Sequence, residues 1–282
     1  MQISAIQSYA FTSNSFAKIS KMITEEELFE GQILKDGQIF NRHTTNYFRE
    51  DMDWSAYADV LQKKFANVPK IDTLIWGCSN GNEAYTMSIL LKYCFGGDYK
   101  KFLPIKAMDI DKDLIEQNKK EQKENFEFSN SNLINLCYAL GISYSDNMDV
   151  LWDFVLRTGF WKYNLQDDIL NSVEFSQSNI LSDVDKIDPN VPTIVMCRNM
   201  WPYVDSDKYN EYAKKLHDRL NENSIVVVGR YDWEGENHNF DYSSFPKVLM
   251  RNGFKPIGDI INPDRLYDAL PRGATLLFEP VK

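Results

Sequence analysis

A polar loop between a hydrophobic segment and a candidate helix is the first feature of this chain whose residues suggest chemistry. The stretch TLIWGCSNGNEAYTM spans residues 73–87, and its loop, GCSNG, covers 77–81. Asp109 comes directly after the next hydrophobic segment. In open α/β sheets, the loop after the first strand approaches the cofactor and an acid after the second strand binds a ribose. The pattern is therefore compatible with an adenosine-containing ligand.

The loop alone leaves a second interpretation open. Its glycines are spaced as GxxxG, which is neither the dinucleotide pattern GxGxxG nor the phosphate-binding pattern GxxxxGK[ST]. A sharp turn at the start of a helix also favours glycine, because glycine tolerates backbone conformations that other residues avoid. Other segments must decide between a cofactor loop and a simple turn.

The elements that would position this loop alternate along the chain. Hydrophobic runs predict strands, and amphipathic stretches between them predict helices. Such an alternation predicts a doubly wound α/β domain over residues 65–282, with helices on both faces of a mostly parallel sheet. The expected strands are 73–76, 105–108, 172–175, 193–197, 224–229 and 274–279, and the expected helices are 82–94, 111–122, 206–220 and 243–254, the last ending at Gly253.

Two regions lie outside this alternation. Residues 1–64 form a short N-terminal region that we expect to be helical. Residues 123–171 are too apolar for a free linker and too irregular for one strand–helix unit, so we expect an insertion packed on the domain.

The overall charge argues against several classes of partner. Lys and Arg total 31 against 41 Asp and Glu, a formal charge of −10, and no dense basic run is present. Binding to nucleic acid or to anionic membranes is therefore not expected. No run of 18 apolar residues and no signal-peptide pattern are visible, so we expect neither membrane insertion nor secretion.

Cysteine and histidine usage indicates a reduced setting without a metal site. The four cysteines are scattered without a CxxC pair, so neither a disulfide framework nor a zinc site is expected. The three histidines are dispersed among unrelated segments. We expect a cytoplasmic protein with no metal.

Five segments follow one another along the chain, namely TNYFRE (45–50), WGCSNGNEAYTMS (76–88), AMDID (107–111), VEFSQSNIL (173–181) and MCRNMWPYVD (196–205). In this order they resemble the CheR family of chemoreceptor glutamate methyltransferases, which use S-adenosylmethionine (SAM) and produce S-adenosylhomocysteine (SAH). The TNYFR and CRN pieces are specific to the family, whereas the glycine loop and the acid are shared by many SAM enzymes. The resemblance implies a Rossmann-like class I SAM methyltransferase fold.

The resemblance implies a set of cofactor-binding residues. Arg49 would hold the carboxylate of the methionine part, Glu83 would lie near its amino group, and Asp109 would accept the ribose hydroxyls. Asn179 and Ile180 would flank the adenine. The full set is Thr45, Arg49, Gly77, Cys78, Ser79, Gly81, Glu83, Asp109, Asn179, Ile180 and Cys197.

Each of these residues also has a simpler interpretation. Arg49 would otherwise be a surface arginine, and Glu83 a solvated residue in a first helical turn. Asp109 would otherwise cap the helix that begins near Asp111, and Asn179 would be a turn residue.

At the methyl-transfer end, the resemblance implies catalytic roles for Arg198, Asn199 and Tyr203. They follow the predicted strand 193–197, at the strand end where the active edge of such a sheet lies. The alternatives are a salt-bridged arginine and a half-buried tyrosine.

The expected reaction needs no general base. A glutamate side chain has an ordinary pKa of about 4.3, so the nucleophile is already ionised at pH 7. What remains is to align oxygen, methyl carbon and sulfur at near-attack distance. Arg198, and with it Arg230, would attract an acidic protein or peptide acceptor to a chain of net charge −10, and the resemblance makes a chemoreceptor-like protein one candidate.

The chain departs from the family pattern, and the departures keep the acceptor open. Asn82 and Ala84 replace a glutamate and a proline, and NENS (221–224) replaces a PGG turn. The 44 residues ahead of TNYFR are fewer than the family's basic N-terminal domain, and the insertion shows no clear hairpin of a peptide-docking subdomain. A SAM methyltransferase on another acceptor, such as a small molecule, and a non-catalytic SAM-binding module remain alternatives. The presence of both CRN and Tyr203 argues against the latter. No oligomeric state is predicted.

Overall fold

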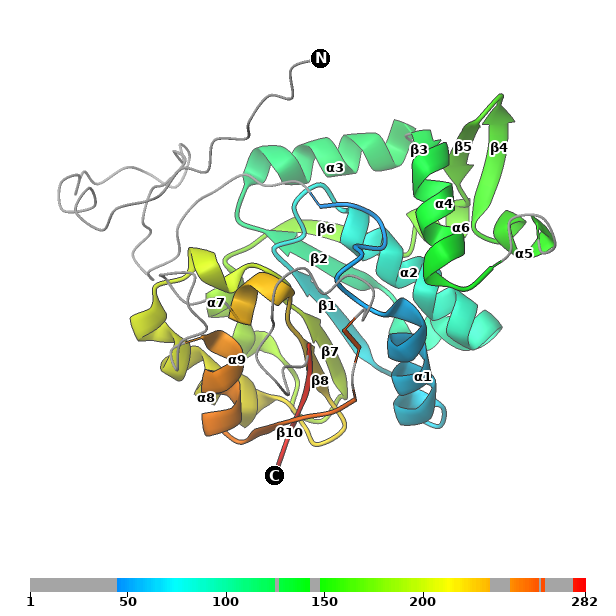
Figure 1. Ribbon diagram of the computed structural model, residues 1–282. Coiled ribbons are helices and arrows are strands. Elements are labelled where there is room, and N and C mark those ends of the chain that lie inside the picture. Colours follow the sequence, from blue (N-terminus) through cyan, green and yellow to red (C-terminus); the bar gives the residue numbers. More distant parts are fainter. Residues whose placement is uncertain (1–44, 125–126, 143–147, 234–243, 259, 262–275) are drawn as a thin grey trace, which may run out of the picture.

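A seven-stranded sheet forms the centre of the molecule (Figure 1). The computed structural model describes residues 45–124, 127–142, 148–233, 244–258, 260–261 and 276–282. The strand order is β6-β2-β1-β7-β8-β10-β9. The strands are β1 (Asp72–Trp76), β2 (Ile105–Asp109), β6 (Val173–Gln177), β7 (Thr193–Met196), β8 (Ile225–Val227), β9 (Phe254–Pro256) and β10 (Leu277–Pro280).

The central strand β1 explains why the sheet is parallel at its core. Its last four residues, from Thr73 to Trp76, are buried, as expected for a strand covered by helices on both faces. β1 pairs in parallel with β2 on one side and with β7 on the other. Only β10 runs antiparallel to its neighbours, β8 and β9, among the described strands of this sheet.

Helices cover both faces of the sheet. Figure 1 shows α1 and α2 on one side of the sheet and α8 and α9 on the other. The helix α2 is buried continuously from Glu83 to Leu91, because it packs against the sheet and against α1. The helices of this domain are α1 (Trp54–Phe65), α2 (Asn82–Phe95), α3 (Lys112–Glu124), α6 (Asp167–Leu170), α7 (Ile180–Asp183), α8 (Tyr209–Arg219) and α9 (Phe245–Arg251), with 3-10 turns η1 (Gly96–Phe102), η2 (Val184–Lys186), η3 (Trp201–Tyr203), η4 (Ser206–Lys208) and η5 (Arg230–Trp233).

This architecture confirms the predicted doubly wound α/β fold, with differences at element ends. The helix expected over 206–220 begins with η4, whose first residues are capped by Asp205. The helix expected over 243–254 is shorter, and its end precedes Gly253, which has φ +86°. The start of the last expected strand, residues 274–275, lies outside the described residues.

The insertion contains a hairpin that sequence analysis did not predict. A second, three-stranded antiparallel sheet has the order β3-β5-β4, in which β4 and β5 are consecutive strands. The expectation of no clear hairpin was wrong. The sequence hides this hairpin, because β3 is very short and only the first residue of β4 is buried, so apolar and polar residues alternate weakly. The elements are β3 (Glu127–Ser129), α4 (Asn130–Ala139), α5 (Met148–Trp152), β4 (Val155–Gly159) and β5 (Lys162–Leu165).

The described part of the N-terminal region packs directly on the sheet domain. Its helix α1 ends at Phe65, next to the predicted boundary between residues 1–64 and 65–282, and contacts α2. That division into two units stays a prediction, and residues 1–44 lie outside the described residues. Among the helices that are described, none is both long and apolar enough to cross a membrane.

Candidate active site

The glycine loop after β1 has a backbone that only a few residue types tolerate. Gly77, Ser79 and Gly81 have φ values of +66°, +50° and +76°. A side chain at Gly81 would also collide with Phe175, whose ring carbon lies 2.7 Å from where a Cβ would be. The loop therefore turns sharply. Three of its backbone N–H groups donate within the protein, that of Cys78 to Met108, that of Ser79 to Asp109 and that of Gly81 to Cys78.

Asp109 lies at the end of β2 and is connected to this loop. Its Oδ2 accepts a hydrogen bond from the Ser79 backbone N–H at 2.8 Å, and its Oδ1 accepts one from the Asp111 N–H at 3.0 Å. Burial raises the pKa of this carboxyl group, and hydrogen bonds from the backbone oppose that shift. The cap of α3 is Asp111, whose Oδ1 accepts from the N–H of Asp113 at 3.0 Å. Asp111 therefore caps α3, and the alternative role of Asp109 as the cap of that helix does not apply.

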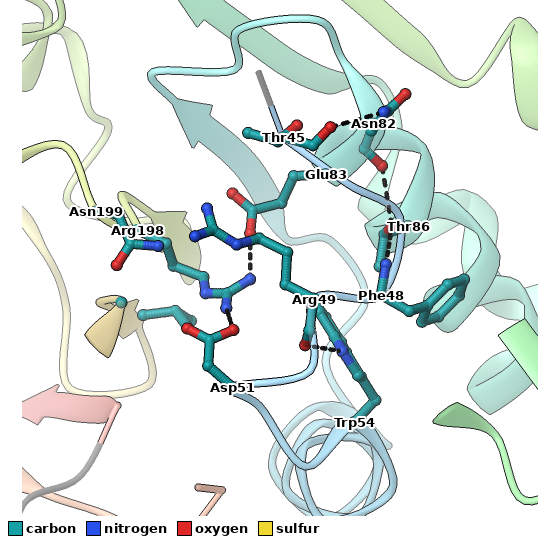
Figure 2. A network of polar contacts seen from close by, with 12 residues as sticks. Thr45, Phe48, Arg49, Asp51, Trp54, Asn82, Glu83, Thr86, Arg198 and Asn199 are labelled. Atoms are coloured by element: carbon teal, nitrogen blue, oxygen red, sulfur yellow. Dashed lines mark hydrogen bonds and ion pairs between the residues drawn. The ribbon is translucent and has the colours of Figure 1, made fainter. Parts of the chain in front are cut away.

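Residues 45–51, which we call the strap, are fastened across the start of α2 (Figure 2). The Thr45 carbonyl accepts hydrogen bonds from the side chains of Asn80 and Asn82, at 3.0 and 2.8 Å. The Phe48 N–H donates to the Thr86 hydroxyl at 3.1 Å. Asn82, which departs from the family pattern, therefore holds the strap in place.

A buried ion-pair cluster joins the strap to α2 and to the loop after β7. The Arg198 side chain has no solvent exposure, and its Nη2 lies 2.5 Å from Oδ1 of Asp51. Its Nη1 is paired with Oε1 of Glu83, which is also buried. Figure 2 shows Arg49 beside these carboxylates. The Trp54 ring lies 5.4 Å from the guanidinium carbon of Arg198.

The charges of this cluster stabilise each other against the cost of burial. Burial alone would raise the pKa of Asp51, but Arg198 and Arg49 lower it below its ordinary value. Burial likewise opposes the charged form of Arg198, and its two carboxylate partners raise the pKa of the guanidinium. Asp51 and Arg198 therefore stay charged at neutral pH.

The other residues expected at the transfer end surround this cluster. Asn199 adopts φ +58° and donates its backbone N–H to Asp232 at 2.7 Å. Tyr203 is half-buried, and its pKa is raised by burial and by the nearby Asp232 carboxylate. Cys197 is different, because its buried Sγ accepts from Trp201 Nε1 at 3.4 Å. That thiol packs inside the sheet region, so only its backbone can face a ligand.

The residues expected to flank the adenine lie after β6. Asn179 caps the short helix α7, since its side-chain oxygen accepts from the Leu181 N–H at 3.1 Å. The side chain of Asn179 therefore has the local structural role that the alternative interpretation, a turn residue, gives it. Ile180 is the first residue of α7. Both residues follow a strand that neighbours β2, on the same edge as Asp109.

A cavity of about 270 Å³ opens beside the ion-pair cluster. Two arginines, Arg49 and Arg230, face it from the strap and from the turn after β8, together with the carboxylate of Asp51. Its other lining residues are Asn46, Tyr47, Phe48, Glu50, Asn135 and Tyr231. A larger depression of about 570 Å³ lies near residues 66–69 and 97–101, before β1 and β2, which is the wrong end of the strands for a ligand site.

Sequence analysis missed three contributors to the site. Asp51 follows the TNYFRE segment but has no motif of its own, and Asp232 is a single acid in a short turn. Asn80 was noted only as part of the glycine loop. Each acts through backbone or ion-pair contacts with residues distant in sequence, so local patterns carry no signal for them.

The residues present fit SAM. The left-handed glycine loop presents backbone groups, Asp109 lies where ribose hydroxyls are expected, and Glu83 lies near the strap arginine. The side-chain Nδ2 of Asn199 is buried and has no partner within the described part of the chain, which leaves a donor for a ligand.

Comparison with known proteins identifies the family of this chain. The family model "CheR methyltransferase, SAM binding domain" matches residues 43–248. A chemotaxis protein methyltransferase of Borreliella burgdorferi is 25% identical over 215 residues, which cover 74% of this chain and 70% of that protein. Chemotaxis protein methyltransferase 2 of Vibrio cholerae is 25% identical over 188 residues, 66% of this chain and 60% of that protein.

Solved structures of SAM methyltransferases are similar at a low level. The TehB-like SAM-dependent methyltransferase of Corynebacterium glutamicum is 12% identical, with a TM-score of 0.38 over 79% of this chain and 84% of that one. The family match spans well over half of the sequence and includes all five segments singled out above. The chain belongs to the CheR methyltransferase family and is a SAM-dependent methyltransferase.

Proposed function

We propose that the chain transfers the methyl group to a carboxylate, namely a glutamate side chain of an acidic protein or peptide, and so forms a γ-glutamyl methyl ester. The observation that carries this proposal is the cavity of about 270 Å³ beside the ion-pair cluster. Arg230 lines it and would attract the acceptor carboxylate, while Arg49, which also lines it, would hold the carboxylate of the methionine part of SAM. The curated relatives are chemotaxis methyltransferases, which makes a chemoreceptor-like acceptor part of the proposal.

The residues of this chain have distinct parts in that reaction. Arg49 binds the methionine carboxylate, Glu83 the amino group, and Asp109 the ribose hydroxyls, while backbone groups of residues 77–79 line the cofactor. Asn179 and Ile180 flank the adenine. Thr45 anchors the strap that carries Arg49.

The chemistry is a direct displacement. Bound SAM supplies a methyl group activated by a positively charged sulfur. A glutamate oxygen attacks the methyl carbon, the carbon–sulfur bond breaks, and its electron pair stays on sulfur, so that SAH leaves without any proton transfer. The protein has to align the two reactants and exclude water from them.

Arg198 has an organising part in this scheme. Its two terminal nitrogens are paired with Asp51 and Glu83, which gives less support to the prediction that it steers the acceptor itself. Arg198 instead holds the carboxylate of Glu83 in place to bind the cofactor, and it holds that of Asp51 at the wall of the cavity. Asn199 and Tyr203 lie beside this cluster, where they would orient the methyl end.

The setting of the reaction is also part of the proposal. We infer a reducing cytoplasm, in which the four cysteines would stay as thiols, and two of them lie buried near the site, Cys78 in the glycine loop and Cys197 after β7.

The test is incubation with methyl-labelled SAM and cell lysate, followed by mild base. We expect protein-bound label that is released as methanol, because carboxyl methyl esters are base-labile. An Arg230→Ala variant should label protein more slowly, since the cavity loses a cation, while Arg251→Ala on the exposed side of α9 should match the parent chain. Base-stable label, or label in small molecules alone, would show a different acceptor.

A further inference from the structure

One buried carboxylate joins two loops at the methyl-transfer edge of the sheet. Asp232 lies in the turn after β8 and is 1% exposed. Its Oδ2 accepts from the backbone N–H groups of Gly229 and Asn199, at 2.6 and 2.7 Å. Its Oδ1 accepts from the Trp201 N–H at 3.1 Å. The loops after the neighbouring strands β7 and β8 are thus held together by one side chain.

These contacts fix Asn199 in a conformation that it would not keep unaided. Its φ of +58° is uncommon for a residue with a side chain and has to be stabilised by the surroundings. Its side-chain oxygen accepts from the Tyr231 N–H at 2.9 Å. A Cβ on Gly229 would lie 2.1 Å from that oxygen, so the amide packs directly on the glycine. Asn199 is therefore held through both its backbone and its side chain.

The fixed loop carries the groups that organise the site. Arg198 precedes Asn199, and its guanidinium holds Asp51 and Glu83. A rotation of the peptide between residues 198 and 199 would move that guanidinium. The buried Nδ2 of Asn199, which has no partner in the described residues, would move with it.

We propose that Asp232 is a positioning residue for methyl transfer, which holds Arg198 and Asn199 in their reactive arrangement without touching cofactor or acceptor. The inference rests on the proposed place of methyl transfer at this edge and not on the identity of the acceptor. The inference requires that the loop after β7 affects the methyl-transfer step and has little effect on the binding of SAH. SAH would be held by the glycine loop, Asp109 and the strap, which lie on other elements.

The first test replaces Asp232 with an amide of the same shape. In Asp232→Asn the single oxygen cannot accept all three N–H groups, so at least one bond of the set is lost. Hydrogen exchange at residues 199, 201 and 229 should accelerate about tenfold or more, the size expected for one lost hydrogen bond at the buried loop.

Kinetics of the same variant give a second measurement. We expect kcat to fall roughly 10- to 100-fold, as for a small misplacement of reacting groups, with the Kd for SAH within about threefold of the parent chain. Asp188→Asn is the matched control, because that exposed carboxylate also accepts a backbone N–H, from Asn190 at 2.9 Å.

A second variant keeps Asp232 and displaces Asn199 alone. Gly229→Ala forces the Asn199 amide away, and Gly229 has no left-handed backbone to oppose alanine. It should lower kcat with unchanged affinity for SAH. Gly97→Ala is its matched control, since a Cβ there meets nothing within 4 Å. If Asp232→Asn does not fold, Gly229→Ala decides the part of the inference that concerns Asn199, and unchanged kcat in this variant would overturn it.

Three results would overturn the inference. They are unchanged exchange at residues 199 and 201 in Asp232→Asn, unchanged kcat in the folded variants, or a loss of SAH affinity that parallels the loss of kcat. Hydrogen exchange needs no acceptor, so it decides whether Asp232 holds the loop even if no protein in the lysate is labelled. The absence of labelled protein would count against carboxyl methylation and not against this inference.

Discussion

At the scale of single residues, the site depends on one arginine shared between two acids. The three groups come from the strap, from α2 and from the loop after β7, and all of them are largely buried. Such a cluster costs free energy to desolvate, and removal of one member leaves the others uncompensated. The contribution of this cluster to the free energy of unfolding should therefore depend on pH.

We expect Asp51→Asn to lower the free energy of unfolding by about 1 to 3 kcal/mol at pH 7, because a charged hydrogen bond to Arg198 is lost. The pKa of Asp51 is lower in the folded chain than its ordinary value of 3.8. Its contribution is therefore present above the unfolded pKa and is lost as the pH falls through the folded one. Urea unfolding of parent and variant should differ by a constant amount from pH 7 to about 5 and converge below about 4.

The control for this prediction is Asp188→Asn, whose carboxylate is exposed and should change stability little at any pH. A difference between parent and Asp51→Asn that persists undiminished to pH 3 would show that the lost stability does not come from the charged pair.

At the scale of elements, the strap depends on side chains at the start of α2. The Thr45 carbonyl is shared by Asn80 and Asn82, so each tether partly replaces the other. We expect Asn82→Ala to weaken SAH binding about 2- to 10-fold, the effect of one hydrogen bond, because Arg49 on the strap becomes less well placed. Calorimetric titration with SAH measures this change.

Asn190→Ala is a suitable control, since Asn190 is exposed and its hydrogen bonds in the described part of the chain go to Asp188, two residues before it. Equal SAH affinities in the parent chain, in Asn82→Ala and in the double variant Asn80→Ala, Asn82→Ala would mean that the strap takes no part in cofactor binding.

The elements also show how far sequence reasoning reaches. Strands such as β1 and β7 are short, continuous apolar runs bounded by turns, so their positions in the sequence could be predicted, and so could the glycine loop. The hairpin of β4 and β5 could not, because exposed residues follow one another along β4 without alternation. Asp232 was not predicted, because its three partners are backbone groups that a sequence does not display.

At the scale of the whole molecule, cofactor binding should stabilise the fold. The proposed SAM site is assembled from the strap, the glycine loop, the end of β2 and the residues after β6, so a ligand bound there links segments that are far apart in the sequence. At SAH concentrations about 100 times its Kd, the expected gain is about 2.7 kcal/mol. That corresponds to a rise in Tm on the order of 5 to 10 °C for a chain of this size.

Thermal unfolding with and without SAH measures this shift. Arg49→Ala and Asp109→Ala should each lose most of it, whereas Arg251→Ala should keep it. A full shift in both of the first two variants would place the bound ligand elsewhere on the molecule.

The position of β10 has a consequence for folding during synthesis. This strand, Leu277–Pro280, lies between β8 and β9 and pairs with both (Figure 1). While the chain is being synthesised, β8 and β9 leave the ribosome before the strand that lies between them. One edge of β8 then presents unpaired hydrogen-bonding groups, which is the condition under which nascent chains associate with one another. The sheet can close only after residues 277–280 have been synthesised, and until then this edge of β8 is open to a chaperone.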